Sequence, residues 1–478
     1  MRKQLSRKLL KGGVLSPAEL KAVVQQVSAM GLNSISLGSR QDILFKIPDD
    51  VSREPLDSDI VIPGKEKSEN IVSSYLASDI FQATPWLKAD RYLYILEQFQ
   101  FKPILKINIT DPQQRLVPLF TGHLNFIASG HEDYWYLYIR LPEWDNTKMF
   151  PALIYSWDIS KISKAIQGIL KEEPETVEMI FELLIGNLDL NSRTVDKPLE
   201  IPFYPFPYYE GMNRIGDSHY WLGLYWRNNS YDTQFLEEMC DLCATCRIGK
   251  ISITPWKSLI IKGIPSEYKL VWEKFLGKFG INIRHSMLEL NWHLPVCDAE
   301  ALELKQYLVN NFDKKDISTY GLTFSITNCI RKAYYFTSIV IEKNKPLVVD
   351  EHVQLRSTYN LLYAKNFDPN TRKYIVHVQD VDHTQLTDLL IELSQMYFDR
   401  LGTTSEVEAK ALKAVLKVDE KVYQCPDCQT IYDAEFGDSD QGIDPGTLFE
   451  DLPENYVCSL CDTPKAQFEE LVVQKQVK

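Results

Sequence analysis

The first stretch with a clear hydrophobic pattern is GGVLSPAELKAVVQQVSAMGLNSISLGSRQDILFKIP, residues 12–48. Apolar residues recur at helical spacing after Ser16 and Pro17, and beyond Gly31 they alternate with polar residues. The pattern predicts a helix, a turn and two strands. Ser16 can cap this helix, with Pro17 at its first position.

The same order of elements returns much later, in WLGLYWRNNSYDTQFLEEMCDLCATCRIGKISITPWKSLIIKGIP, residues 221–265. When the two stretches are aligned, residues 35–37, Ile-Ser-Leu, fall on residues 251–253, Ile-Ser-Ile. Self-similarity at so long a period indicates duplicated domains rather than a solenoid.

Composition places the chain among multidomain globular proteins. Its 478 residues exceed what one core usually supports, and 45% of them are hydrophobic against 24% charged. The basic amino terminus lacks the apolar run of a secretory signal, and no stretch approaches the roughly 18 apolar residues that span a bilayer. We therefore expect a cytoplasmic protein that does not associate with membranes.

Four of the nine cysteines form two CxxC pairs, one at residues 425–428 and the other at residues 458–461. In a chain without an export signal this favours metal binding over disulfides. Four thiolates converging on one ion select iron or zinc, and the spacing does not separate the two metals. The predicted ligands are Cys425, Cys428, Cys458 and Cys461.

The sequence between and around these pairs resembles rubredoxin over about 50 residues. The resemblance rests on the CPxC knuckle, the turn at residues 442–447 (GIDPGT), residues 449–453 (FEDLP), and Thr-Pro-Lys at 463–465. The family's aromatic core positions are filled by Tyr423, Tyr432, Phe449, Tyr456 and Phe468. The resemblance implies one iron ion per chain that carries single electrons, with Cys428 and Cys461 nearest solvent as the exit route.

Two departures follow the knuckles. Rubredoxins usually carry glycine there, whereas this chain has Gln429 and Asp462, and Thr430 replaces an aromatic residue. Glycine permits a left-handed backbone, which Asp tolerates better than Gln does. We expect a shifted reduction potential or a looser knuckle, with metal binding retained.

Negative charge is concentrated at the carboxy-terminal end. Residues 421–471 contain twelve Asp or Glu and two Lys, a net −10 of the −13 carried by the whole chain. Such a surface repels nucleic acid and attracts a redox protein with a basic docking patch. Asp427, Glu454 and Asp462 belong to the expected docking rim. The alternative is a face that only keeps the protein in solution.

Residues 1 to about 400 resemble the siroheme-dependent sulfite and nitrite reductases. The duplicated stretches look like that family's paired ferredoxin-like half domains, with Arg40-Gln41 and residues 254–256 at its threonine-rich turns. Further traces lie at residues 70–72, around Lys106, and at residues 120–129. The implied fold class is α+β, with duplicated half domains, a reductase-like core and a small rubredoxin domain.

The implied domain boundaries follow from both resemblances. A first reductase-like half spans residues 1–165, with its half domain at 1–50, and a second spans 166–400, with its half domain at 215–285. A linker helix at 401–420 then leads to the rubredoxin domain at 421–471.

The family binds a [4Fe-4S] cluster through C-x5-C and C-x3-C, and those cysteines are mostly absent here. Asn291, Thr327 and Arg331 stand at three of the four ligand positions, Cys297 remains at one, and Cys329 is out of register. We therefore expect neither siroheme nor a [4Fe-4S] cluster. Only Lys106 is left of the family's basic run, and a structural role for Arg40 is favoured over contact with a tetrapyrrole.

The run CDLCATC suggests a second thiolate site at Cys240, Cys243 and Cys246. It lies in a predicted helix, where Cys246 is turned away from the face that the other two share, and no C-P follows it. Small apolar core residues are the favoured interpretation.

The leading hypothesis is therefore an electron-transfer protein. A non-catalytic reductase-like scaffold positions the rubredoxin for a redox partner, of which a component of nitrite or sulfite assimilation is one candidate. One alternative is a redox enzyme whose large region still binds a tetrapyrrole or another cofactor and is fed by the rubredoxin. The other is a zinc-stabilised interaction module.

Overall fold

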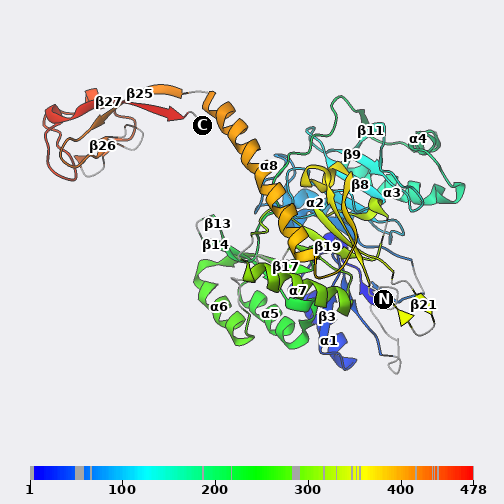
Figure 1. The fold of residues 1–478 in the computed structure, drawn as a ribbon. Helices are drawn as coiled ribbons and strands as arrows, with labels where there is room; N and C mark the ends of the chain where they lie inside the picture. Colours follow the sequence, from blue (N-terminus) through cyan, green and yellow to red (C-terminus); the bar gives the residue numbers. More distant parts are fainter. Residues whose placement is uncertain are drawn as a thin grey trace. The chain divides into compact units, whose positions relative to one another are not determined.

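The chain divides into two compact units, Met1–Ser394 and Gln395–Lys478, in a computed structural model. The ribbon is drawn in Figure 1. The structure describes residues 5–48, 59–64, 67–185, 188–216, 218–281, 291–315, 318–329, 331–345, 348–350, 353–354, 357–414, 417–432, 434, 437–438 and 441–476.

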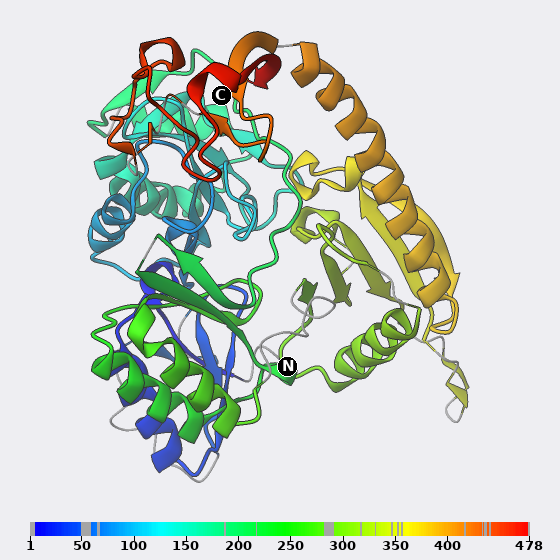
Figure 2. The same ribbon diagram turned by 90° about the vertical axis from the view of Figure 1, so that its left-hand side faces the viewer.

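The predicted internal repeat is confirmed. The first copy consists of α1 (Pro17–Ala29), β3 (Ser34–Leu37) and β4 (Ile43–Phe45). The second consists of α5 (Thr233–Thr245), β16 (Ile251–Ile253) and β17 (Ser258–Pro265). Figure 2 shows α1, in blue, beside the green helices of the second copy.

Each copy lends a strand to the other's sheet. β2 (Val14–Leu15) pairs with β16, and β15 (Tyr231–Asp232) pairs with β3. The two sheets have the orders β15-β3-β4-β1-β5 and β13-β14-β17-β16-β2. Because each exchanged strand directly precedes its helix, the two copies fold around one shared hydrophobic core. The remaining strands are β1 (Ser6–Lys8), β5 (Ile60–Val61), β13 (Gly211–Ile215) and β14 (His219–Tyr225).

Both repeat helices begin at a capping side chain. Ser16 accepts a hydrogen bond from the Glu19 backbone N–H, and Glu19 accepts one from the Ser16 backbone N–H, so the capping role of Ser16 is confirmed. Asp232, at the equivalent position of the second copy, accepts from the Phe235 N–H. Capping therefore fixes both helix starts locally.

Two larger sheets are also built alike. In one, three parallel strands are followed by antiparallel neighbours: β6 (Ile71–Ser73), β7 (Ile107–Thr110), β8 (Leu124–Ala128), β9 (Tyr134–Ile139), β11 (Ala152–Tyr155) and β12 (Ser192–Thr194). The other repeats this order with β18 (Trp292–His293), β19 (Phe324–Thr327), β20 (Ile339–Lys343), β23 (Tyr359–Ala364) and β24 (Tyr374–Val381). Helices α2 (Ala89–Glu97) and α7 (Ala299–Lys314) link their first two strands.

The other elements of the first unit are α3 (Ile159–Gly168), α4 (Val177–Ile185), α6 (Lys269–Lys278), β10 (Lys148–Met149), β21 (Val348–Asp350) and β22 (Val353–Gln354). Among the described residues, no helix combines the length and apolar character needed to cross a bilayer.

Helix α8 (Leu386–Ala414) crosses the boundary between the units, and it covers much of the expected linker helix at 401–420. The second unit then forms a three-stranded sheet in the order β26-β25-β27. Its strands are β25 (Lys417–Gln424), β26 (Ile431–Tyr432) and β27 (Glu469–Gln476).

Candidate metal centre

The two CxxC pairs lie on turns with the same backbone geometry. In the first, the Gln429 N–H donates to Cys425 O at 2.9 Å, and the Cys425 N–H donates to Thr430 O at 2.8 Å. The second turn repeats both bonds, at 2.9 and 2.8 Å, with Cys458, Asp462 and Thr463. Two equivalent turns can therefore present two sulfurs each.

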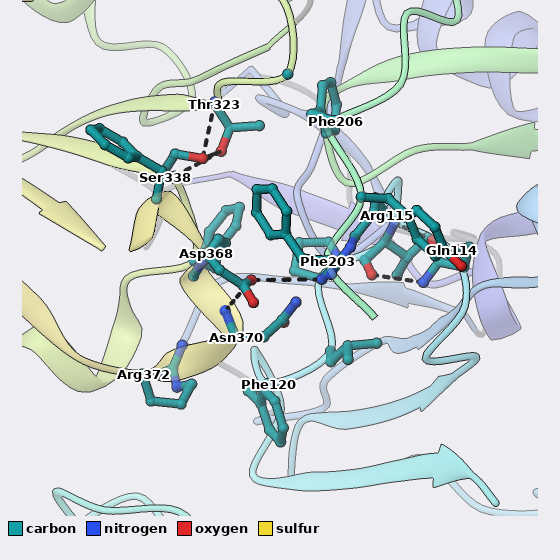
Figure 3. A pocket seen from close by; sticks show the side chains of 18 of the residues that line it. Gln114, Arg115, Phe120, Phe203, Phe206, Thr323, Ser338, Asp368, Asn370 and Arg372 are labelled. Atoms are coloured by element: carbon teal, nitrogen blue, oxygen red, sulfur yellow. Dashed lines mark hydrogen bonds and ion pairs between the residues drawn. The ribbon is translucent and has the colours of Figure 1, made fainter. Parts of the chain in front are cut away.

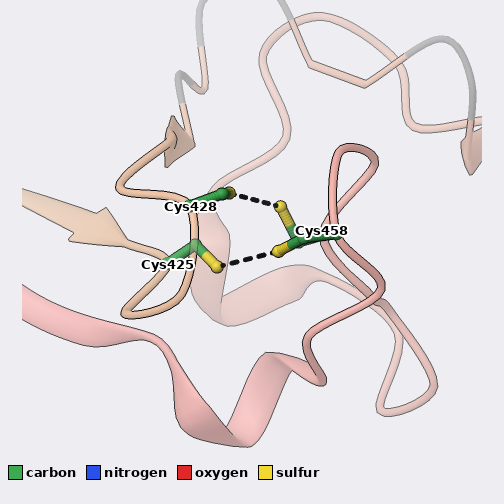
Figure 4. A group of neighbouring side chains, drawn as sticks. Cys425, Cys428 and Cys458 are labelled. Atoms are coloured by element: carbon green, nitrogen blue, oxygen red, sulfur yellow. Dashed lines mark hydrogen bonds between the residues drawn. The ribbon is translucent and has the colours of Figure 1, made fainter.

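The four predicted ligands converge. Their Sγ atoms all lie within 4.8 Å of one another, with 3.4 Å between Cys425 and Cys461 and 3.5 Å between Cys428 and Cys458 (Figure 4). A tetrahedral ion with metal–sulfur bonds of about 2.3 Å needs sulfurs about 3.8 Å apart, so the cage fits iron or zinc. Within the described part of the chain, no other group of three or more His, Cys, Asp or Glu side chains converges in this way.

Burial divides the cage into an inner and an outer pair. Cys425 and Cys458, the first cysteine of each turn, are 0% and 1% exposed. Cys428 and Cys461 are more open to solvent. The outer pair is the pair that the rubredoxin resemblance implied as the exit route.

Hydrogen-bond donors surround the inner sulfur of the first turn. Burial raises the pKa of the Cys425 thiol, but hydrogen bonds from Thr463 and from the backbone of Cys428 and Asp427 outweigh it and lower that pKa to about 6. These donors stabilise negative charge on sulfur, which a thiolate ligand carries.

Two threonines beside the cage were missed as site residues by sequence reasoning. The Thr430 Oγ1 atom lies 3.2 Å from Cys428 Sγ, and Thr463 Oγ1 lies 3.0 Å from Cys461 Sγ. Each comes shortly after the second cysteine of its turn, at the same position in both. That shared position was the available signal, but Thr430 was read only as a departure from the family's aromatic residue.

Both departures from glycine adopt the left-handed backbone that glycine favours. Gln429 has φ 61° and Asp462 has φ 60°. The turn therefore imposes the conformation on the side chains present, at a cost in free energy of about 1–2 kcal/mol for a residue such as Gln.

An aromatic cluster forms the core of the small domain, as the sequence predicted. Tyr432, Phe449 and Tyr456 are buried in it, and Tyr423 and Phe468 pack against them. The Tyr423 and Phe449 rings are stacked, with centroids 4.0 Å apart. Asp438 accepts a hydrogen bond from the Tyr456 hydroxyl at 2.9 Å. The small domain thus has a core of its own.

Comparison with known families agrees with this geometry. Residues 422–468 match the rubredoxin family. This segment is a rubredoxin domain. Over 49 residues it is 47% identical to the high molecular weight rubredoxin of Moorella thermoacetica, covering 10% of this chain and 21% of that protein. The chain therefore spans about a fifth of that relative's length. The match supports iron as the metal of the cage.

The fold of the larger region also has a solved counterpart. The NirA protein of Mycobacterium tuberculosis superimposes with a TM-score of 0.61 over 81% of this chain and 79% of its own, at 15% sequence identity. At that identity the likeness concerns fold alone. It confirms the expected α+β architecture of the larger region.

The three residues that the sequence resemblance placed at cluster-ligand positions make contacts of their own in this fold. Asn291 is buried, and its amide donates to Leu322 O at 2.9 Å. Thr327 Oγ1 accepts from the Cys329 N–H at 3.0 Å, and Arg331 pairs with Asp145 at 3.1 Å. The two cysteines of this region, Cys297 and Cys329, are exposed.

Arg40 is buried and hydrogen-bonded. Its guanidinium donates to Asn108 Oδ1 at 2.6 Å and to the backbone oxygens of Asn70 and Ile107 at 2.7 and 2.8 Å. It thus links the repeat turn to the larger sheet. This is the kind of structural role that the sequence favoured.

The CDLCATC run lies in the hydrophobic core. Cys240 and Cys243 belong to α5, and Cys246 ends it, with its N–H donating to Leu242 O at 2.9 Å. All three thiols are buried in the core shared by the repeat copies, as expected for small apolar residues. Cys246 is buried too because Trp272 of α6 packs in the same core.

Proposed function

We propose that this chain is an electron-transfer protein that carries single electrons at one iron ion held by Cys425, Cys428, Cys458 and Cys461. The observation that carries the proposal is the convergence of four sulfurs within 4.8 Å inside a rubredoxin domain. The bound iron supplies a ferric–ferrous couple, and its four thiolate ligands leave no open position for a substrate.

The protein's own part is to hold the cage in one geometry and to stabilise its charge. The aromatic core supports the two turns, backbone N–H groups donate to the Cys425 sulfur, and the Thr430 hydroxyl lies against the Cys428 sulfur. Cys428 and Cys461 are the more open sulfurs, so electrons leave and enter on their side.

A partner would dock over this side. Asp427, Glu454 and Asp462 are exposed, and Leu460, next to Cys461, is 74% exposed. An acidic surface around an exposed apolar side chain is complementary to a redox protein that carries a basic patch. Opposite charges steer the two proteins together, and apolar contact stabilises the complex. We propose a component of nitrite or sulfite assimilation in the cytoplasm as this partner, by analogy with the reductase-like fold.

We propose further that the reductase-like region is a non-catalytic scaffold for this docking. Asn291 is hydrogen-bonded to backbone, and Arg331 pairs with Asp145, so these side chains at cluster-ligand positions have structural partners. Covalent attachment keeps the rubredoxin domain near whatever the scaffold binds, which raises its effective concentration there.

Metal analysis and a visible spectrum of the full chain test the carrier function. We expect about one iron per chain and the absorption bands of ferric thiolate alone. Zinc in a colourless protein would contradict the carrier function and support the interaction module. Additional tetrapyrrole bands would contradict the proposal that the large region is a non-catalytic scaffold, and they would support the alternative that it is a redox enzyme.

Matched cysteine variants assign the ligands. Cys425→Ser or Cys458→Ser should abolish the iron bands, whereas Cys329→Ser, an exposed cysteine of the other unit, should leave them unchanged. An iron spectrum that survives Cys425→Ser would overturn the ligand assignment.

A further inference from the structure

A small cavity in the first unit lies at the meeting of three segments that are distant in sequence. It has a volume of about 50 Å³ (Figure 3). Most of its lining comes from residues 114–115 and 117–120, from Phe203, Tyr204 and Phe206, and from residues 367–370 with Arg372, and it is completed by Trp256, Gly321, Thr323, Phe336 and Ser338. The aromatic rings give it flat walls, and polar side chains reach it from the other two segments.

Arg115 is the notable member of this lining. Its side chain is 10% exposed, and the nearest carboxylate oxygen, Asp368 Oδ1, lies 3.6 Å from Nη1, too far for a hydrogen bond. Its Nε and Nη2 atoms are buried, and neither finds a hydrogen-bond acceptor among the residues that the structure describes. Leaving such charged donors unsatisfied costs free energy.

Positive charge exceeds negative charge around the cavity. Arg372 also lines it, and the buried Arg140 donates to Ala333 O, the same oxygen that accepts from Arg372. Asp368 is the one carboxylate among the described lining residues, and its Oδ1 also accepts from the Asn370 N–H at 3.0 Å. Two guanidinium groups, those of Arg115 and Arg372, thus line a cavity whose one described carboxylate is already shared, and Arg140 adds a third positive charge beside Arg372.

We propose that this cavity binds a small planar oxyanion, of the carboxylate or nitrate type, on the Nε–Nη2 edge of Arg115. Nε–H and Nη2–H lie parallel on one side of a guanidinium and match two oxygens of a planar anion. A water needs about 10–15 Å³ of such volume, so 50 Å³ holds about three or four heavy atoms. The site goes beyond the proposed electron transfer and involves no iron ligand.

Anion-dependent stability of the full chain provides the test. All nine tryptophans lie in the first unit, so their fluorescence follows unfolding of that unit. At fixed ionic strength, replacing chloride by formate or nitrate should raise the unfolding midpoint by about 2 °C or more once the anion is well above its dissociation constant. Sulfate, which is tetrahedral, should do less.

Variants of Arg115 separate specific binding from salt effects. Arg115→Met and Arg115→Lys should lose the response to formate and nitrate, because Met removes the charge and Lys removes the paired donors. Arg193→Met, at a residue whose side chain is 47% exposed, should keep it. Arg115→Met should also be at least as stable as wild type in chloride, since it removes unsatisfied buried donors.

Titration of wild-type protein with nitrate in a calorimeter gives a measurement that does not depend on variants. Saturable binding near one site per chain supports the proposal. No saturable heat together with no stabilisation would overturn it. Equal stabilisation by sulfate, or an unchanged response in Arg115→Lys, would also overturn it.

Discussion

The Thr430 hydroxyl oxygen lies 3.2 Å from Cys428 Sγ, so the more open side of the sulfur cage carries a hydroxyl group. The Thr463 hydroxyl oxygen lies 3.0 Å from Cys461 Sγ, but this hydroxyl donates to Asp427 Oδ2 at 2.7 Å. A hydroxyl that donates to a thiolate sulfur stabilises the more negative, reduced state of an iron–thiolate site, so Thr430 bears on its potential.

The Thr430 hydroxyl accepts from the Cys428 thiol in this structure, and it can donate once that sulfur is a thiolate ligand. Replacing Thr430 by Val should therefore lower the reduction potential, because the reduced site loses this donor. A hydrogen bond of about 1 kcal/mol that is partly lost corresponds to a decrease on the order of 20–40 mV for a one-electron couple. Voltammetry or a redox titration of the visible bands measures it. Thr430→Ser keeps a hydroxyl and should shift the potential less, and equal shifts for Val and Ser would refute the role of the hydroxyl.

Glycine at residue 429 should stabilise the rubredoxin domain. Gln429 has φ 61°, a conformation that costs Gln more than Gly, and the gain is about 0.5–1 kcal/mol after the greater chain entropy of glycine is subtracted. The midpoint of guanidinium unfolding, followed at the iron absorption, should rise. Asp462→Gly should give a smaller gain, because Asp tolerates φ 60° better. A lower midpoint for Gln429→Gly would contradict this account.

Thiol reactivity should separate the cysteines of the first unit into two classes. Burial raises the pKa of Cys240 to about 12, and Cys243 and Cys246 are buried with it, so these thiols should resist alkylation in the native protein. Cys297 and Cys329 are exposed and should react within minutes. Peptide mass spectrometry after iodoacetamide treatment reads both classes. Rapid native labelling of Cys243 would show that this core opens readily.

Stability of the first unit should fall in mild acid because of His123. Burial, with Lys106, Arg40 and Arg140 nearby, lowers the pKa of this imidazole to about 3, against 6.5 in the unfolded chain. Between these two pKa values the unfolded state binds one more proton than the folded state does. The free energy of unfolding therefore decreases as the pH is lowered, by up to about 1.4 kcal/mol for each pH unit. The loss begins near pH 6.5 and amounts to about 2 kcal/mol at pH 5.

Urea unfolding followed by tryptophan fluorescence between pH 7 and pH 5 measures this effect. In the wild type, His123 Nδ1 accepts a hydrogen bond from the Lys106 N–H at 3.1 Å. The His123→Asn variant keeps an acceptor for this N–H, but its side chain does not titrate. Its stability should therefore depend less steeply on pH. Parallel curves for the variant and wild type would rule out His123 as the source.

The sequence alone determined the features that arise from residues close together in the chain. The CxxC spacing defined both sulfur-bearing turns, and Ser16 with Glu19 marked the start of α1, because caps and turns depend on a few neighbouring residues. The internal repeat was visible too, since both copies keep one order of apolar positions. The CxxC spacing was compatible with iron and with zinc, and the resemblance to rubredoxin favoured iron.

Only the tertiary structure decided which distant segments meet. β2 pairs with β16 rather than with its own copy's strands, and nothing in its short sequence specifies that partner, because strand pairing depends on the assembled core. The same holds for the Thr463 hydroxyl, which donates to Asp427, and for Arg115, which lies opposite Asp368, because the two members of each pair lie far apart in the chain. The geometry of each turn depends on a few neighbouring residues. The net charge of a cavity, and the hydrogen-bond partners available in it, depend instead on which distant segments come to line it.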